Sequence, residues 1–111
     1  MDSINENIRK YRIFRGLTQR DLAVYLNKAT NVISNWENGV HSPDIDSVRK
    51  ICNILEVTPN QIFGVEENPD YIRHKQLLEK YSQELENLVK EKDDIDAKIE
   101  KIKQQLNNSI K

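Results

Sequence analysis

The C-terminal part of the chain contains no glycine and no proline after Pro69, and its apolar residues recur at alternating steps of three and four. This spacing lines them up along one side of an α-helix and is typical of a coiled coil. The stripe formed by the a and d positions from residue 78 to 106 is apolar except for one lysine; its members are Leu78, Tyr81, Leu85, Leu88, Lys92, Ile95, Ile99, Ile102 and Leu106. A solitary charged helix would leave this stripe in water, so we predict a coiled-coil helix over residues 71–111 that assembles a homo-oligomer, either a dimer or a tetramer.

The charged residues that flank the stripe bear on how two such helices pair. In a parallel dimer Glu91 would face Asp96 of the second copy, and Lys98 would face Lys103, so both pairs would be like-charged. An antiparallel pair can set Glu91 against Lys98 instead. The charges therefore favour antiparallel or higher-order packing, although exposed pairs contribute only roughly tenths of a kcal/mol each and the parallel arrangement stays open.

The chain before about residue 66 carries five short helical patterns separated by turn signals. Ser3, Thr18 and Thr58 each stand where a side-chain oxygen can cap the start of a helix. Gly16 and Asn27 stand where a left-handed residue would end one. None of these patterns shows the alternation of a strand, so we predict an all-α fold.

The fourth of these patterns follows Ser42-Pro43-Asp44 and has the clearest apolar stripe, and the fifth carries Ile62 and Phe63. We expect residues 1–66 to form one domain, residues 67–70 a linker and residues 71–111 the long helix. The stripe of the fourth pattern, which we expect in the core, consists of Ile45, Val48, Ile51, Cys52 and Leu55.

The second and third patterns have the requirements of a pair of helices that docks on DNA. A helix that enters the major groove needs a second helix to brace it, and the two must approach closely. Ala23 is small enough for such an approach, and Ile33 can plug the inner side of the following helix. The outward positions of that helix carry short polar side chains, which are Thr30, Asn31, Ser34 and Asn35.

These positions resemble the Cro and lambda-repressor type of protein, the Xre family. The resemblance covers about residues 4–64 and rests on Gly16-Leu17-Thr18-Gln19, Leu22-Ala23, Leu26, Ile33, Trp36-Glu37-Asn38-Gly39 and Pro43. It implies a five-helix, lambda-repressor-like DNA-binding domain with a recognition helix over about residues 30–37. It also implies a partly buried salt bridge between Arg12 and Glu37. The residues expected to contact DNA are Gln19, Thr30, Asn31, Ser34, Asn35, Asn38, Arg12, Arg20 and Lys28.

Charge does not by itself identify a DNA-binding protein, because 17 lysines and arginines are balanced by 18 acidic residues to give a formal net charge of −1. The positive potential that phosphates require must then come from local clustering. A cluster of this kind lies in the first two helical patterns, where it could equally be a solvated face; it consists of Arg9, Lys10, Arg12, Arg15, Arg20 and Lys28. The recognition helix itself lacks arginine and lysine, so we expect weak or A·T-biased recognition of a single half-site.

We therefore expect a transcriptional regulator, a repressor, that binds double-stranded DNA as a homo-oligomer. The alternative is a protein-interaction module, an antagonist or antitoxin-like partner that captures a related regulator through its C-terminal helix. The domain could in that case have lost DNA binding. A binding assay on random DNA would separate the two.

Other functions receive no support from the sequence. His41 and His74 are isolated, so no metal site is expected, and no nucleophile triad or glycine-rich phosphate loop suggests an enzyme or a cofactor. Trp36 is expected in the core rather than stacked on a base. Cys52 is the only cysteine, which fits a reducing compartment. With no membrane-spanning run and no signal-peptide layout, we expect a cytoplasmic protein.

Overall fold

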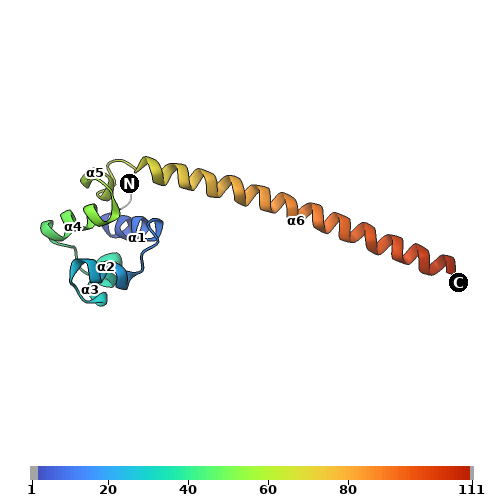
Figure 1. Cartoon of the computed structure of the whole chain (residues 1–111), viewed down its shortest axis with the longest axis horizontal. Coiled ribbons are helices and arrows are strands. Elements are labelled where there is room, and N and C mark those ends of the chain that lie inside the picture. The colour runs from blue at the N-terminus through green and yellow to red at the C-terminus, as the bar shows by residue number, and fades with distance from the viewer. Residues whose placement is uncertain (1–2, 111) are drawn as a thin grey trace. The chain divides into compact units, whose positions relative to one another are not determined.

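The computed structural model describes residues 3–110, and these residues form helices without any strand (Figure 1). The helices are α1 (Ile4–Phe14), α2 (Gln19–Leu26), α3 (Thr30–Glu37), α4 (Ile45–Leu55), α5 (Pro59–Ile62) and α6 (Pro69–Ile110). The predicted all-α fold is confirmed. The expected domain limits at residues 1 and 111 lie outside the described residues. The chain divides into two units, one ending at Ile72 and the other beginning at Arg73.

The ends of the short helices follow the capping residues of the sequence. Ser3 accepts a hydrogen bond from the backbone of Glu6, and Thr58 accepts one from the backbone of Gln61. Both side chains satisfy backbone donors that a helix start leaves without a partner. Gly16 takes the left-handed conformation expected of it, with a φ of 73°.

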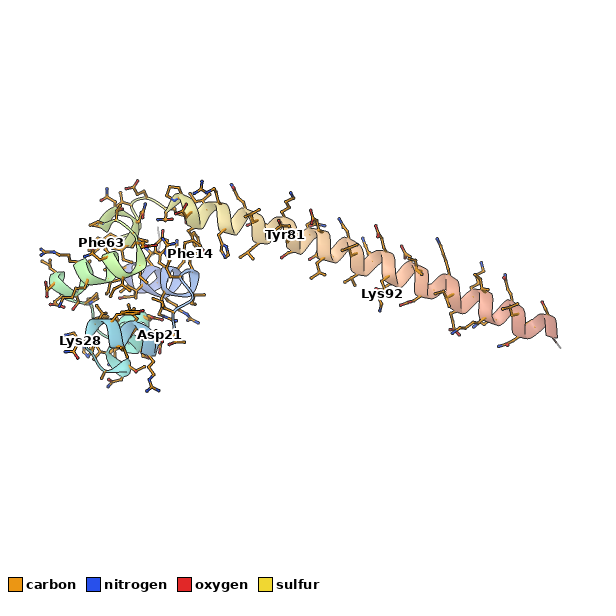
Figure 2. The ribbon with its side chains drawn as sticks, in the orientation of Figure 1. Phe14, Asp21, Lys28, Phe63, Tyr81 and Lys92 are labelled. Atoms are coloured by element: carbon orange, nitrogen blue, oxygen red, sulfur yellow. The ribbon has the colours of Figure 1, made fainter. Side chains whose placement is uncertain are left out.

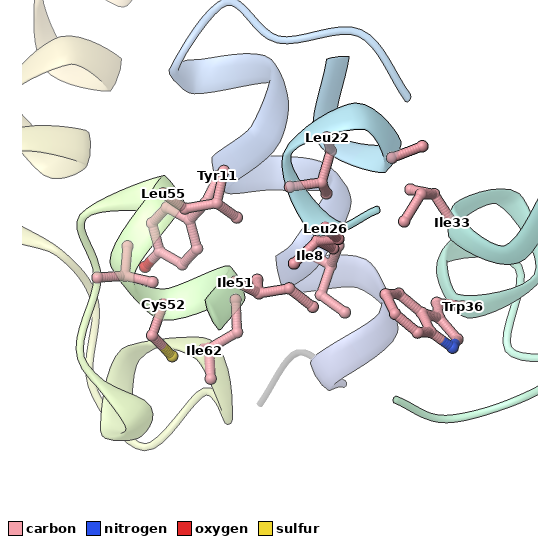
Figure 3. Packing of buried hydrophobic residues seen from close by; sticks show 12 residues of the cluster. Ile8, Tyr11, Leu22, Leu26, Ile33, Trp36, Ile51, Cys52, Leu55 and Ile62 are labelled. Atoms are coloured by element: carbon pink, nitrogen blue, oxygen red, sulfur yellow. The ribbon is translucent and has the colours of Figure 1, made fainter. Parts of the chain in front are cut away.

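A single apolar core holds α1 to α5 together (Figure 3). Ile8 and Tyr11 of α1 meet Leu22 of α2, Ile51 of α4 and Ile62 of α5, and all five side chains are fully buried. Figure 1 shows α2 and α3 together on one side of the domain and α5 on the opposite side. The core therefore serves as a common base from which α2 and α3 can present their outer faces.

The expectation that Ile45 lies in the core is wrong. Ile45 is 83% exposed, because it is the first residue of α4 and lies at the rim of the domain instead of over its core. It borders an open apolar groove of about 790 Å³ that Ile4, Val48 and Phe63 also line. Phe63, which follows the last residue of α5, is half exposed as well.

Asn68 joins the domain to the start of α6. Its backbone N–H donates to the hydroxyl of Tyr11 at 3.1 Å, and its side-chain amide donates to Gln61 at 3.1 Å. The side-chain oxygen accepts from the backbone N–H groups of Asp70 and Tyr71, which makes Asn68 the cap of α6. Residues 67–70, expected as a linker, thus contain a buried cap and the first residues of the helix.

Helix α6 has 42 residues, and none of its side chains over residues 69–109 is buried. The stripe predicted from the heptads is exposed: apart from Lys92, its members have between 45% and 63% of their surface accessible. None of the helices over residues 3–110 combines the length and the apolar character needed to cross a membrane.

Candidate nucleic-acid interface

Helices α2 and α3 are joined by a tight turn over residues 27–29. Asn27 has a φ of 55° and a ψ of 45°, the left-handed conformation expected at this position. The next residue, Lys28, donates its backbone N–H to the carbonyl of Ala23 at 2.9 Å and closes the turn. Ala23 is buried and has only a methyl group, so α3 can pack closely against α2.

The outer face of α3 is polar. Thr30, Asn31 and Asn38 are exposed, whereas Ser34 and Asn35 are half-buried. Asn38 donates its side-chain amide to the hydroxyl of Ser34 at 3.3 Å. The opposite side of the helix is anchored by Ile33 and Trp36, which are buried in the core as expected. The face that carries the five expected contact residues is thus held in one orientation.

Arg12 and Glu37 form the paired interaction that the resemblance implied. The Nε and Nη2 atoms of Arg12 donate to the two carboxylate oxygens of Glu37 at 2.8 and 2.9 Å. Its Nη1 atom donates to the carbonyl of Leu17 at 2.7 Å. Gln19 donates its amide to Glu37 at 3.3 Å. We refer to these four residues as the Arg12 clamp.

The Arg12 clamp connects the end of α1, the start of α2 and the end of α3. Its two charged side chains are almost fully buried, with 10% of Arg12 and 2% of Glu37 accessible. A bidentate pair of this kind fixes two groups in direction as well as distance. The clamp therefore sets the angle of α3, and Arg12 acts as a positioning residue in the domain.

Two further basic residues of the expected cluster are engaged within the domain. Lys10 pairs with Glu67 at 3.3 Å and lies over the rings of Tyr11 and Tyr71. Arg15 donates to the backbone carbonyl groups of α4 and its end, at Leu55 and Glu56. The side chains of the cluster that are exposed are those of Arg9, Arg20 and Lys28.

Asp21 adds a negative charge at the start of α2. It completes a capping box: Thr18 accepts from the backbone of Asp21 at 3.0 Å and donates its own backbone N–H to the Asp21 carboxylate at 2.9 Å. Hydrogen bonds from the backbone and the side chain of Thr18 lower the pKa of Asp21, so this carboxylate is charged at neutral pH. Figure 2 shows Asp21 on α2 and Lys28 in the turn that follows it.

A helix-turn-helix family matches residues 8–62 of the chain. This match spans α2, the turn and α3, together with the helices that support them. The chain carries a helix-turn-helix domain of the Xre type. The predicted family resemblance is confirmed for this domain, whereas the predicted coiled coil over α6 stays a prediction.

Two curated proteins are similar to part of the chain. The HTH-type transcriptional regulator ImmR of Bacillus subtilis (strain 168) is 31% identical over 65 residues, which are 59% of this chain and 51% of that protein. The HTH-type transcriptional activator BcrR of Enterococcus faecalis is 33% identical over 63 residues, which are 57% of this chain and 31% of that protein. The similar segments thus cover about half of one relative and about a third of the other.

The contacts around the helix-turn-helix domain include groups that the sequence did not single out. Asn7 is fully buried on α1 and donates its side-chain amide to the carbonyl of Ile62 at 3.0 Å. Leu17 contributes its carbonyl oxygen to the Arg12 clamp. A backbone acceptor leaves no trace in the residue pattern, so only the unusual placement of Arg12 on a buried helix face could have indicated it. Over residues 3–110 no group of three or more histidine, cysteine or carboxylate side chains could hold a metal ion.

Proposed function

We propose that the chain is a transcriptional regulator that binds double-stranded DNA by inserting α3 into the major groove. The observation that carries this proposal is the polar outer face of α3, held by the Arg12 clamp and by buried Ile33. A major groove admits one helix and presents base edges to short polar side chains. The helix-turn-helix match and the printed names of both relatives support the same function.

Base contacts are assigned to Thr30, Asn31 and Asn35. An asparagine amide can donate to adenine N7 and accept from adenine N6, and a threonine methyl can contact the methyl of thymine. Ser34 and Asn38 contact each other and lie at the edge of this surface. Sequence recognition through these side chains is expected to favour A·T pairs, because α3 offers no arginine to guanine.

Phosphate contacts are assigned to Arg20, Lys28 and Gln19. Arg20 is exposed at the start of α2, beside Gln19, and Lys28 is exposed in the turn that follows α2. Arg12 holds Glu37 and Leu17, so in this proposal it orients α3 rather than touching DNA. Because few basic side chains contact phosphates, a single domain should bind DNA weakly, and its affinity should depend only slightly on salt concentration.

Self-association through α6 compensates for this weak binding in the proposed function. Covering the exposed apolar stripe of α6 lowers the free energy, and a second copy carries the same stripe. When two linked domains bind two half-sites, the second binding event is intramolecular, so the overall affinity of the pair exceeds the affinity of either domain alone. Repression then follows from occupancy of promoter DNA, without any further contact with the transcription machinery.

A selection from random DNA at a stated salt concentration tests the proposal directly. We expect an enriched, A·T-containing site. Asn31→Ala and Asn35→Ala should each weaken binding to that site by about 1–3 kcal/mol, which is what a bidentate base contact contributes. Asn60→Ala on α5 is the matched control, since Asn60 is an exposed asparagine away from α3, and it should bind like the parent chain.

The same experiment distinguishes the second candidate function. Binding that shows no preference above non-specific DNA would contradict the regulator and favour an interaction module that uses α6 to capture a related protein. A reporter placed behind the selected site tests the sign of regulation. Reduced expression supports repression, whereas increased expression would contradict it.

A further inference from the structure

The exposed stripe of α6 constrains the direction in which a second copy can pair. We propose that two α6 helices associate antiparallel, with Lys92 of each chain opposite Ile95 of the other. This inference rests on the self-association proposed above and adds its geometry. In this register the layers on either side combine Leu85 with Ile102, Leu88 with Ile99 and Tyr81 with Leu106, each from opposite chains, and the outermost layer sets Leu78 against Ser109.

Lys92 is the one charged member of the stripe, and it separates the two directions. A parallel pair aligned on the heptads would place the two Lys92 side chains against each other in the same layer. In the antiparallel register each Lys92 lies beside the apolar side chain of Ile95 instead. Lys92 reaches Asp96 on its own helix, with 3.7 Å between the ammonium and the carboxylate. The ammonium can thus leave the layer while its methylene groups cover the isoleucine. Figure 2 shows Lys92 part-way along α6.

The charges beside the stripe point in the same direction. Around the two-fold axis of the antiparallel pair, Glu91 of each chain faces Lys98 of the other, which gives two attractive contacts. A parallel pair would oppose Glu91 with Asp96 and Lys98 with Lys103, each twice, which gives four repulsive contacts. All six contacts favour the antiparallel pair over the parallel one, so their small individual contributions to the free energy of association add up.

This arrangement determines how far apart the N-terminal ends of the two helices lie. With the axis between residues 93 and 94, the two Arg73 residues are about 60 Å apart along the pair. Adjacent half-sites on B-DNA are about 34 Å apart, one helical turn. An antiparallel pair therefore holds the N-terminal ends of the two α6 helices farther apart than one turn of DNA, whereas a parallel pair would bring both ends together.

Disulfide cross-linking of the full-length chain distinguishes the two directions. Two variants are made on a Cys52→Ala background: Leu85→Cys and Ile102→Cys. In the antiparallel register neither variant cross-links with itself, because the two cysteines lie about 25 Å apart. An equal mixture should form a disulfide dimer that contains one chain of each variant, identified by the pair of peptides that the disulfide joins after proteolysis. Self-linked dimers of either variant would overturn the proposal.

Reversal of single charges gives a second test that leaves the apolar layers intact. Lys98→Glu and Glu91→Lys should each weaken self-association, roughly threefold to tenfold, and the double variant should restore the parental dissociation constant. A parallel pair predicts the opposite sign, because each change would then create attraction to Lys103 or Asp96. Residues 91 and 98 are two turns apart in one chain, so their coupling in a double-mutant cycle reports the contact between chains.

The two tests also separate this inference from the proposal beneath it. A parent chain that sediments as a monomer would overturn self-association through α6 altogether. A dimer whose variants cross-link with themselves, or whose charge reversals tighten it, would overturn only the antiparallel direction. A dimer in which the equal mixture fails to cross-link would overturn the register with Lys92 opposite Ile95.

Discussion

Arg12 donates from three nitrogens, and all three of these hydrogen bonds end inside the domain. Two go to Glu37 and one to the carbonyl of Leu17, at distances between 2.7 and 2.9 Å. Burying two charges costs solvation free energy, so the pair contributes to orientation more than to net stability. Removal of one partner is different, since it leaves the other charge buried without a counter-ion.

We expect Arg12→Ala to lower the free energy of unfolding by about 3–5 kcal/mol, the usual effect of breaking a buried pair. The apolar double variant Arg12→Met/Glu37→Leu should regain most of that stability, because it leaves no buried charge. Urea denaturation measures both. DNA affinity of the double variant should stay reduced even where the domain is folded, since the angle of α3 is no longer fixed. Full recovery of DNA binding would contradict the positioning role of Arg12.

Asp21 makes the stability of the domain depend on pH in the acidic range. Its folded pKa lies below the ordinary value of 3.8, so its contribution to stability is fully present above about pH 5. That contribution should disappear as the pH falls through the folded pKa. Asp21→Asn lacks the titration, and the difference in melting temperature between the two chains should shrink between pH 5 and pH 2. A constant difference across this range would contradict the capping role of the ionised carboxylate.

At the scale of elements, the end of α4 combines a strained residue with a stabilising contact. Glu56 has a φ of 56°, which a residue with a Cβ adopts at a cost. Arg15 holds this end by donating to the carbonyl groups of Leu55 and Glu56 at 2.7 and 3.1 Å. Basic side chains at a helix C-terminus bind its free carbonyl groups in this way. The strained residue thus marks the sharp turn into α5.

We expect Glu56→Gly to raise the free energy of unfolding by about 0.5–1 kcal/mol, because glycine adopts this conformation without strain. The change removes only a long contact of 3.7 Å between Arg15 and an exposed carboxylate. Glu66→Gly serves as a control at an exposed glutamate outside the helices. Thermal unfolding compares the three chains, and a loss of stability in Glu56→Gly would mean that the ion pair outweighs the strain.

The helices were largely predictable from the sequence, because their starts depend on local hydrogen bonds. Thr18 and Thr58 cap α2 and α5 through residues three positions away, and such pairs are visible in the chain itself. Ile45 was misplaced because periodicity does not reveal where a helix leaves the core. Asn68 was missed for a related reason: its partners Tyr11 and Gln61 come together only through the fold.

The candidate site was predictable to a similar extent. The turn at Asn27 and the outer face of α3 follow from local pattern and resemblance. The binding partners of the basic side chains could not be predicted in this way, since Lys10 and Arg15 bind groups more than 35 positions away in the sequence. Long-range contacts of this kind depend on how the helices pack, and the residue pattern alone does not contain them.

At the scale of the whole molecule, the boundary between the two units predicts how the chain can be divided. Truncation after Ile72 retains Asn68 and the contacts of the Tyr71 ring with Tyr11 and Phe14, at 5.6 and 5.4 Å between ring centroids. Truncation after Gly64 removes all of them. We expect the shorter chain to be less stable by about 2–4 kcal/mol, the sum of a lost helix cap, a buried hydrogen bond and the aromatic contacts.

Denaturation of both fragments tests this expectation, and sedimentation of the longer fragment in the ultracentrifuge tests the role of α6. The fragment that ends at Ile72 should be a folded monomer that binds DNA more weakly than the full chain. Equal stability of the two fragments would contradict the boundary at Ile72. Retained self-association of the longer fragment would place the oligomer interface in the domain instead of α6.

Asn68 also bears on how α6 comes to exist as a helix. The first turn of any helix is the slow and unfavourable part of its formation, because several residues are ordered for a single hydrogen bond. Asn68 lies on the folded domain and already holds the backbone N–H groups of Asp70 and Tyr71. The domain thus provides the nucleus, and α6 grows from it toward the C-terminus. Helix formation in a single chain should accordingly be directional, with amide exchange slowest beside Asn68 and faster with every turn away from it.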